Sequence, residues 1–387
     1  MVHLGRTLDF RLPEGQSAFL WGPRQTGKST YLRRRFPDSI WFDLLQTDLF
    51  LDLNRRPSLL REEILATTPE SRRLPIVIDE VQKVPAVLDE VHWLMENEGL
   101  SFVLSGSSAR QLKRGNANLL GGRAWSFHLF PLTSQEVGEV DLLRILNRGM
   151  LPRPYLQGHH ERSLRAYTRD YLKEEVFDEG LTRNIPAFSR FFEAMAFSHG
   201  ELTNFANIAR DCGVDGKTVK EYYQILVDTL LGTWVPPYKR RQNRQIVSKA
   251  AKFYLFDVGV AGSLQGRTLS HERGEAFGKS LEHFVLMEIL AHASYRELHY
   301  PVHFWRTKSG LEVDFILGDG RVAIEVKGSS RVERKDLRGL LTFSREQAPD
   351  LAIAVCNEAR PRKLENLLLL PVRDFLERLW SGEIIGG

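Results

Sequence analysis

Nine consecutive residues, from Gly22 to Thr30, combine glycines, a lysine and hydroxyl side chains at a spacing suited to holding phosphate groups. They fit the pattern G-x-x-x-x-G-K-[ST], in which Gly22 and Gly27 let main-chain amides approach phosphate oxygens without a Cβ clash. Lys28 reaches the terminal phosphates, and Ser29 offers its hydroxyl to Mg²⁺. The segment therefore predicts an ATP site that uses the whole run: Gly22, Pro23, Arg24, Gln25, Thr26, Gly27, Lys28, Ser29 and Thr30.

A pair of acidic residues, Asp79 and Glu80, follows the apolar run Ile76-Val77-Ile78. At the end of a strand, Asp79 would hold Mg²⁺ through water, and Glu80 would polarise the attacking water as a general base. The two segments occur in the order that one phosphate-cleaving site needs, which predicts ATP hydrolysis with Mg²⁺ as cofactor. The alternatives are a chance match to the pattern and an inactive ATPase.

Two further segments are candidates for the same chemistry. Ser105-Gly106-Ser107-Ser108 follows a short apolar run, and a polar group there could sense the terminal phosphate or simply cap a turn. Arg123, which follows two glycines, could be an arginine finger that enters a neighbouring subunit's site, or an ordinary surface residue. A finger supplied in trans makes hydrolysis depend on assembly, so we expect a homo-oligomer, with a hexamer as one candidate.

Short apolar runs alternate with helical patterns around these residues. Runs at 18–21, 40–44, 75–78 and 102–104 read as strands, with helical patterns from Lys28 and over 87–95 between them. Strands that alternate with helices predict a parallel α/β sheet, and the run at 75–78 suits a strand buried on both faces. We assign this P-loop domain to residues 1–155.

The next part, residues 156–260, has mostly helical patterns. Phe205 to Cys212 and Thr218 to Leu230 are amphipathic and flank a Gly-containing turn, which predicts helix, tight turn, helix. Strand-like runs at 233–235 and 252–256 follow, so the set reads as a winged helix-turn-helix. The basic residues between those strands would form the wing and bind DNA, or would be a solvated face; they are Lys239, Arg240, Arg241 and Arg244.

At this point the chain resembles a known group, the AAA-type ATPases of bacteria and archaea whose C-terminal half was long called a domain of unknown function. The segments that carry the resemblance are Gly22 to Ser29, Ile78-Asp79-Glu80-Val81-Gln82, Leu104 to Ser108, Gly122-Arg123, Lys252-Phe253-Tyr254-Leu255-Phe256-Asp257-Val258-Gly259 and Glu312-Val313-Asp314-Phe315. The resemblance spans nearly the whole chain. It implies an AAA-like core, a winged-helix segment and a restriction-endonuclease-like α+β domain, which we assign to residues 261–387.

Three residues of that last part, Asp314, Glu325 and Lys327, fit the pattern D…(D/E)-x-K of nuclease folds. The two carboxylates stand on adjacent strands and could converge on one Mg²⁺ or Mn²⁺, with Glu282 on the preceding helix as a further ligand. Lys327 lies two residues after Glu325, so it shares its face of the strand and could orient water or stabilise the transition state. The alternatives are a surface ion pair on an edge strand and a platform that binds DNA without cleaving it.

Other polar residues carry weaker signals. His271, His283 and His303 lack the spacing of a zinc site, and we expect ordinary roles for them. Cys212 and Cys356 are the two cysteines, which excludes a disulfide framework and fits a reducing cytoplasm.

Composition limits the function classes. The 387 residues are 42% hydrophobic and 26% charged, as in globular proteins, and the net charge of +4 is weak evidence for an anionic partner. Apolar runs stay far below the roughly 20 residues of a membrane span. Three functions remain: an oligomeric ATP-driven protein that binds and processes DNA, an ATP-licensed metal-dependent nuclease, and an ATP-gated switch that docks a protein partner.

Overall fold

The computed structural model describes residues 4–108, 120–171, 184–239 and 250–386, and these form two compact units. The N-terminal unit consists of Leu8–Phe130 with Asp228–Leu231. The C-terminal unit consists of Met1–Thr7, Pro131–Val227 and Gly232–Gly387. The helical region and the last sheet therefore lie in the same unit, and their predicted boundary at 260/261 stays a prediction, as does the one at 155/156.

The N-terminal unit is built on a five-stranded sheet with the order β2-β3-β4-β1-β5, and all its strand pairs are parallel. This confirms the predicted parallel α/β arrangement. Helices connect the strands because parallel neighbours need a crossover. In chain order the elements are β1 (Ser17–Trp21), α1 (Lys28–Arg35), β2 (Trp41–Asp43), α2 (Thr47–Arg55), α3 (Leu59–Ala66), β3 (Ile76–Asp79), α4 (Val87–Glu98), β4 (Phe102–Gly106) and β5 (Ala124–His128).

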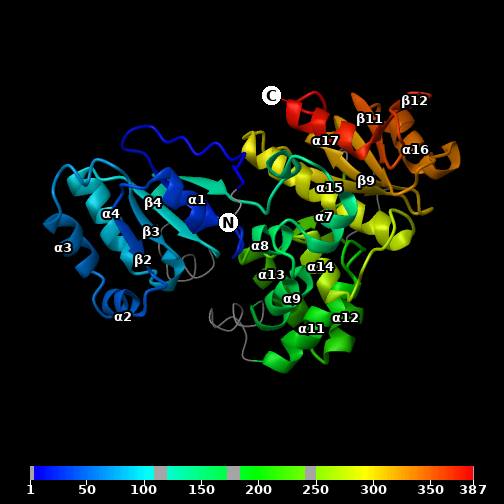
Figure 1. Cartoon of the computed structure of the whole chain (residues 1–387). Helices are drawn as coiled ribbons and strands as arrows, with labels where there is room; N and C mark the ends of the chain where they lie inside the picture. Colours follow the sequence, from blue (N-terminus) through cyan, green and yellow to red (C-terminus); the bar gives the residue numbers. More distant parts are fainter. Residues whose placement is uncertain (1–3, 109–119, 172–183, 240–249, 387) are drawn as a thin grey trace. The chain divides into compact units, whose positions relative to one another are not determined.

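Both faces of this sheet are covered. Successive strand side chains point to opposite faces, and one set, which includes Phe19, Ile78 and Leu104, packs with apolar residues of α3 and α4. Helix α1 lies on the other side of the sheet from α4 (Figure 1). The central strands β1, β3 and β4 are buried along their whole length, as expected for a parallel sheet covered on both faces.

The C-terminal unit begins with a helical region. Its elements are α6 (Ser134–Val137), α7 (Leu142–Arg148), α8 (Pro152–Leu156), α9 (His160–Ala166), η3 (Tyr167–Tyr171), α11 (Ile185–Phe197), α12 (Phe205–Cys212), α13 (Gly216–Asp228), β6 (Gly232–Val235), β7 (Lys252–Leu255) and α14 (Val258–Leu264). Strands β6 and β7 form an antiparallel pair. The predicted helix, turn, helix and strand pair are thus present, whereas their interpretation as a winged helix stays a prediction.

A six-stranded mixed sheet, with the order β12-β13-β11-β10-β9-β8, forms the rest of this unit. Strands β8, β9 and β10 are antiparallel neighbours, and β11 returns parallel to β10 after a helix. The elements are α15 (Glu275–Tyr295), β8 (Val302–Arg306), β9 (Glu312–Leu317), β10 (Val322–Lys327), α16 (Arg338–Gln347), β11 (Leu351–Cys356), β12 (Arg362–Leu364), β13 (Leu367–Pro371) and α17 (Val372–Ser381).

One apolar core joins the helical region to this sheet. It includes Ile145 of α7, Val258 of α14, Phe284 of α15 and Ile324 of β10, all buried. Helix α15 is long and buried over most of its length, so it packs between the two regions (Figure 1). The separate C-terminal sheet is confirmed, and its likeness to a nuclease fold stays a prediction. Among the described residues, every helix is too short or too polar to cross a bilayer.

Candidate nucleotide site and carboxylate cluster

The glycine-rich loop follows β1 directly and leads into α1. The Gly22 amide donates to the Gly106 carbonyl at 3.3 Å, which fixes the start of the loop beside the end of β4. A Cβ on Gly22 would lie 2.5 Å from the Leu129 carbonyl oxygen, so a larger residue does not fit there. Gly27 caps α1 with φ 94°, a left-handed conformation that favours glycine. The loop is therefore shaped by both predicted glycines.

Lys28 points back into this loop. Its side chain is 4% exposed, and Nζ donates to the main-chain carbonyls of Gly22 at 2.8 Å and Pro23 at 3.3 Å. Thr26 Oγ1 also donates to the Pro23 carbonyl, at 2.8 Å. Ser29 lies in the first turn of α1, where free amides and the helix dipole favour an anion. The ammonium and the helix N-terminus thus share the space where phosphate groups would bind.

The acidic pair lies at the carboxyl end of β3. The neighbouring strand β4 ends beside it, at Ser105 and Gly106. Asp79 is 1% exposed and accepts a hydrogen bond from the Ser105 hydroxyl. Strand β4 lies between β3 and β1, and all three run parallel, so the acidic pair and the glycine-rich loop occupy the same edge of the sheet. The structure thus brings Asp79, Glu80 and Lys28 to the same end of the parallel strands.

Glu80 has a strained backbone and a polar partner that sequence reasoning missed. Its φ of 58° is uncommon for a residue with a side chain and is typical of functional sites. Gln82 Nε2 donates to Glu80 Oε2 at 2.5 Å and to Ser107 Oγ at 3.0 Å. Gly106 leaves room for this amide, because a Cβ there would lie 2.6 Å from Gln82 Oε1. Gln82 therefore orients the carboxylate that we predict to be the base.

Arg123 lies away from this edge. It precedes Ala124, which pairs with Ser17 at the amino end of β1, whereas the glycine-rich loop follows the carboxyl end. Its Nε forms an ion pair with Glu96 Oε1 of α4 at 2.6 Å, and about half of each side chain is exposed. Arg123 therefore does not contact the phosphate loop of its own chain, and its role as a finger in trans stays a prediction.

A second set of charged residues gathers in the C-terminal unit, where β9 and β10 meet. We call its four carboxylates, from Glu282, Glu312, Asp314 and Glu325, the carboxylate cluster. The register of β9 and β10 places Asp314 opposite Glu325, one position beyond the pair Phe315 and Ile324. Asp314 Oδ2 accepts from the Val326 amide at 2.7 Å, and Lys327 Nζ lies 2.5 Å from Glu325 Oε1.

Strand β7 contributes two further residues to this cluster. Lys252 is 4% exposed, and its Nζ lies 2.6 Å from Glu312 Oε1 and 3.4 Å from Glu282 Oε1. The Tyr254 hydroxyl donates to Glu282 Oε1 at 2.5 Å. Glu312 Oε2 also pairs with Arg306 Nη1 at 2.9 Å. Glu282, predicted as a metal ligand, is thus held by a tyrosine and a lysine of a neighbouring strand.

Burial and mutual repulsion perturb the carboxyl groups. Burial, followed by the charges of Glu325 and Glu282, raises the pKa of Asp314 well above its usual value. Burial likewise raises the pKa of Glu325 to about 6, against the opposing effect of Lys327. Lys252 keeps its charge, because the attraction of Glu282, Asp314 and Glu312 exceeds the cost of burial and raises its pKa.

The cluster opens on a cavity of about 540 Å³ within the C-terminal unit. Lys252, Tyr254, Glu282, Glu312 and Asp314 line one part, and His199, Arg267, Lys279 and His283 are among the other lining residues. His283, one of the histidines given an ordinary role, donates from Nε2 to the Leu255 carbonyl at 2.6 Å. The cavity is therefore polar and carries both signs of charge.

The arrangement of the cluster does not fit a divalent metal ion as it stands. In the described part of the chain, no three acidic, histidine or cysteine side chains are arranged as a metal site. Lys252 holds Glu282 and Glu312, and Lys327 holds Glu325. Among the described residues of the cluster, Glu325 Oε2 is a buried atom for which no hydrogen-bond partner is found. The metal-binding roles of Glu282, Asp314 and Glu325 stay predictions.

In this parallel sheet, the first strand leads into a glycine-rich loop and a helix, and an acidic pair lies beside the loop. These features together define a P-loop nucleotide-binding unit. Residues 14–138 match the family described as an AAA domain, which supports an AAA-type P-loop ATPase. Residues 139–271 and 277–375 match two families, each described as a domain of unknown function (DUF8612 and DUF4143). The expected AAA-type unit and C-terminal domain of unknown function are therefore confirmed.

Two uncharacterized proteins resemble most of the chain. One is from Mycobacterium tuberculosis and the other from Mycobacterium bovis, and each is 28% identical over 324 residues. The match covers 80% of this chain and 70% of each relative. The similarity therefore extends through both units, but the relatives carry no described activity.

Lys252 and Tyr254 contact the carboxylate cluster, but neither was predicted from the sequence to have a role in this site. They lie two positions apart on a strand, which puts them on one face, and both occur in the segment that carried the family resemblance. In that segment, Asp257 caps α14 through the Gly259 and Val260 amides at 2.9 Å. The position of Lys252 and Tyr254 on the same face of one strand was thus the sequence feature that could have identified them.

Proposed function

We propose that this chain hydrolyses ATP at the glycine-rich loop and couples the cycle to DNA binding as a homo-oligomer. The observation that carries the first part is the convergence of Lys28, Asp79 and Glu80 on one edge of the parallel sheet. The cradle fits a nucleotide, because Gly22 leaves no room for a Cβ and the lysine lies inside the loop.

Each residue has one role in this proposal. The glycine-rich loop and Lys28 bind the phosphates, and Ser29 and Asp79 would hold Mg²⁺. Mg²⁺, when bound, supplies positive charge to the phosphate oxygens. Glu80 accepts the proton of the attacking water, and Gln82 keeps its carboxylate oriented. Ser107, bonded to the same amide, is close enough to respond to the state of Glu80.

ATP turnover tests this part directly. Wild type should release phosphate from ATP in the presence of Mg²⁺, and Lys28→Ala should weaken ATP binding by about a hundredfold, since it removes charged hydrogen bonds to phosphate. Lys83→Ala is the matched control, because Lys83 is exposed and follows the same acidic pair. Equal turnover in Lys28→Ala and wild type would exclude this site as the ATPase.

DNA binding is supported by the region from α12 to β7. Asn204 caps α12 through the Ala206 and Asn207 amides at 3.1 Å, and Gly213 ends that helix with φ 67°. Lys217 and Lys220 are exposed on the first turns of α13, where a second helix of such a motif contacts DNA. The basic residues Arg240, Arg241 and Arg244 of the proposed wing lie outside the described residues.

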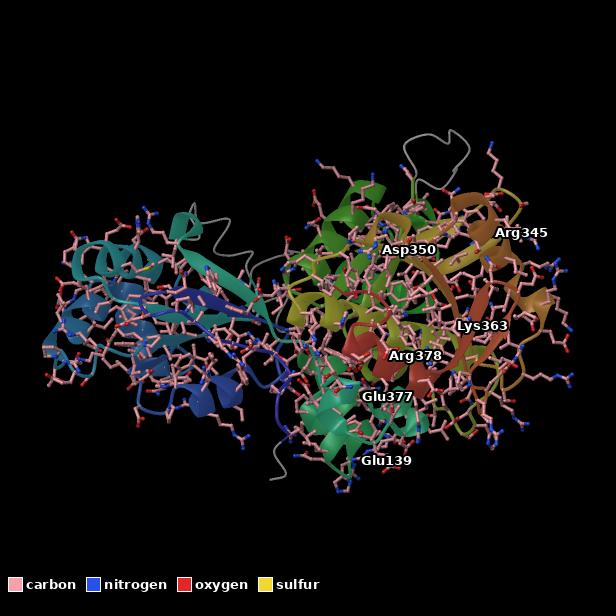
Figure 2. All side chains as sticks on the ribbon, turned by 90° about the horizontal axis from the view of Figure 1, so that it is seen from above. Glu139, Arg345, Asp350, Lys363, Glu377 and Arg378 are labelled. Carbon is pink, nitrogen blue, oxygen red and sulfur yellow. The ribbon has the colours of Figure 1, made fainter. Side chains whose placement is uncertain are left out.

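The salt dependence of DNA affinity tests this interface. Charge reversal at Lys217 and Lys220, and separately at Arg240, Arg241 and Arg244, should flatten the slope by about one unit per lost phosphate contact. Lys335→Glu with Lys363→Glu is the control, because both lysines are exposed in the C-terminal sheet region; Lys363 is labelled in Figure 2. An unchanged slope in both test sets would mean that these residues are merely solvated.

Assembly can be tested through Arg123. If it acts in trans, specific turnover rises with protein concentration. Chains with Arg123→Ala and chains with Lys28→Ala, each inactive alone, should regain activity when mixed, because one supplies the loop and the other the finger. Turnover that is flat with concentration, in a chain that stays monomeric with ATP, would count against the homo-oligomer.

The carboxylate cluster supports a second candidate function, metal-dependent cleavage of DNA, through the convergence of Asp314, Glu325 and Lys327. The ion pairs of Lys252 with Glu282 and Glu312, and of Lys327 with Glu325, favour a platform without cleavage instead. Plasmid and single-stranded DNA incubated with Mg²⁺ or Mn²⁺ distinguish the two. Cleavage that Asp314→Asn abolishes would establish the nuclease, and intact DNA in both metals would support the platform.

A further inference from the structure

The ammonium group of Lys252 lies between two carboxylates of the carboxylate cluster. Lys252 reaches in from β7, Glu282 from α15, and Glu312 from β9. The Lys252 side chain is 5% exposed and passes over the Phe304 ring, whose centroid lies 5.6 Å from Nζ. A buried charge is retained only when opposite charges compensate its lost hydration. The surrounding carboxylates provide that compensation.

The charges of the cluster are nearly balanced by its ion pairs. Its four carboxylates meet three cations in the described residues, because Lys252 and Arg306 hold Glu312 and Lys327 holds Glu325. With all four carboxyl groups ionised, about one negative charge is left over. Without Lys252, about two would be left, which is the charge that one divalent cation neutralises.

Oxygen atoms for such a cation are already present. Glu325 Oε2 is buried without a partner, in a residue that is 6% exposed, and Asp314 lies opposite it on the neighbouring strand. The adjoining cavity of about 540 Å³, lined by Lys252, Glu282 and Asp314, has room for water and an ion. A divalent cation placed there with Lys252 unmoved would meet a like charge at a largely buried site.

We propose that Lys252 is a built-in cation of the carboxylate cluster, which takes the place of a divalent metal ion and keeps the cluster metal-free. The cluster then gains an Mg²⁺ or Mn²⁺ site when the ammonium is removed. Lys252 from β7 thereby links the strand pair of the helical region to the C-terminal sheet. This proposal goes beyond ATP hydrolysis and does not depend on it.

Binding of Mn²⁺ to the full chain, without nucleotide, tests the proposal. Electron paramagnetic resonance of free Mn²⁺ should show weak uptake by wild type, and affinity at least about tenfold higher in Lys252→Met, which keeps the side-chain length but removes the charge. The melting temperature of Lys252→Met should fall in chelator and rise with Mn²⁺, because the cation binds the native state. Wild type should show little change.

Two variants separate the proposal from a general charge effect. Lys279→Met removes a charge from the same cavity, but Lys279 is half-exposed and pairs with Glu201 and Glu275, so it should gain no Mn²⁺ affinity. Adding Glu282→Gln to Lys252→Met should remove the gained affinity, because it deletes a ligand and a charge.

Several outcomes would overturn the proposal. Tight Mn²⁺ binding by wild type, lost in Asp314→Asn, would show that metal and Lys252 coexist. Absence of binding in folded Lys252→Met, or an equal gain in Lys279→Met, would show that the ammonium does not occupy a cation site. If Lys252→Met unfolds, Mn²⁺ should restore its circular dichroism, and Lys252→Gln offers a polar, uncharged substitute. Failure of Mn²⁺ to restore either variant would also contradict the proposal.

Discussion

Both units contain a lysine that is 4% exposed, yet the two ammonium groups meet different partners. Lys28 of the N-terminal unit donates to the main-chain carbonyls of Gly22 and Pro23. Lys252 of the C-terminal unit lies between the carboxylates of Glu282 and Glu312. Bonds to carbonyls are readily exchanged for stronger bonds to phosphate, whereas full ion pairs in a buried site are costly to break.

This difference separates a lysine placed for a ligand from a lysine that is part of the structure. The loop around Lys28 lies at the carboxyl ends of parallel strands, which is where ligands bind in open α/β sheets. The ammonium of Lys252 joins β7 to α15 and β9, so its charge contributes to stability before any ligand arrives. Substitutions in the two sites should therefore affect different measurements.

The largest effect is expected in the N-terminal unit, on turnover. Glu80→Gln removes the proposed base but keeps the shape of the side chain, so turnover should fall about a thousandfold while ATP affinity stays within a factor of about three. Phosphate release and binding of a fluorescent ATP analogue measure the two quantities. Glu63→Gln, on the exposed face of α3, is the control. Normal turnover in Glu80→Gln would show that another residue positions the water.

The next effect concerns the stability of the C-terminal unit. Lys252→Ala leaves the partly buried Glu282 without its cation, whereas Glu312 keeps Arg306, and the free energy of unfolding should fall by about 3 kcal/mol in chelator. Lys279→Ala breaks exposed ion pairs and should cost about 0.5 kcal/mol. Denaturant unfolding followed by circular dichroism measures both. Similar losses in the two variants would mean that Lys252 is no more structural than a surface lysine.

A pH dependence should accompany the carboxylate cluster. The pKa of Glu325 is raised from 4.5 to about 6 in the folded chain, so the native state favours the protonated carboxyl group. Stability from this group is complete below pH 4.5 and is lost as pH rises through 6, by about 2 kcal/mol. Unfolding at a series of pH values should show this fall, and Glu325→Gln should flatten it. An equally steep fall in Glu325→Gln would assign it to other groups.

The smallest effect should come from the residue that orients the base. Gln82→Leu removes the hydrogen bonds to Glu80 and Ser107, and turnover should fall about tenfold, as expected for one bond to a charged group. Steady-state turnover at saturating ATP measures it. A loss as large as that of Glu80→Gln would make Gln82 part of the water-activating machinery, and no loss would leave its contact without a role in turnover.

The two sites also differ in how far the sequence predicts them. The phosphate loop is one local segment whose glycine conformations and lysine position follow from the residues themselves, and the parallel strands beside it follow from apolar runs. Gln82 was not predicted as a site residue, because its role depends on a contact with Ser107, which follows β4. The carboxylate cluster draws on β7, α15, β9 and β10, so spacing along the chain revealed Asp314, Glu325 and Lys327 but not Lys252 or Tyr254. The interpretation of the basic wing stays open, because residues 240–249 lie outside the part of the chain that the structure describes.

Pro237 and Tyr238, which follow β6, cover part of β8, an edge strand of the C-terminal sheet. Pro237 bridges to Phe304 of β8, and the Tyr238 amide donates to the Phe304 carbonyl at 2.6 Å. An uncovered outer strand is a template for pairing with other chains, and this stretch occupies part of it. The opposite border, β12, is short and carries Arg362 and Lys363. A fragment that starts at residue 261 would lose the cover on β8 and should aggregate through that strand.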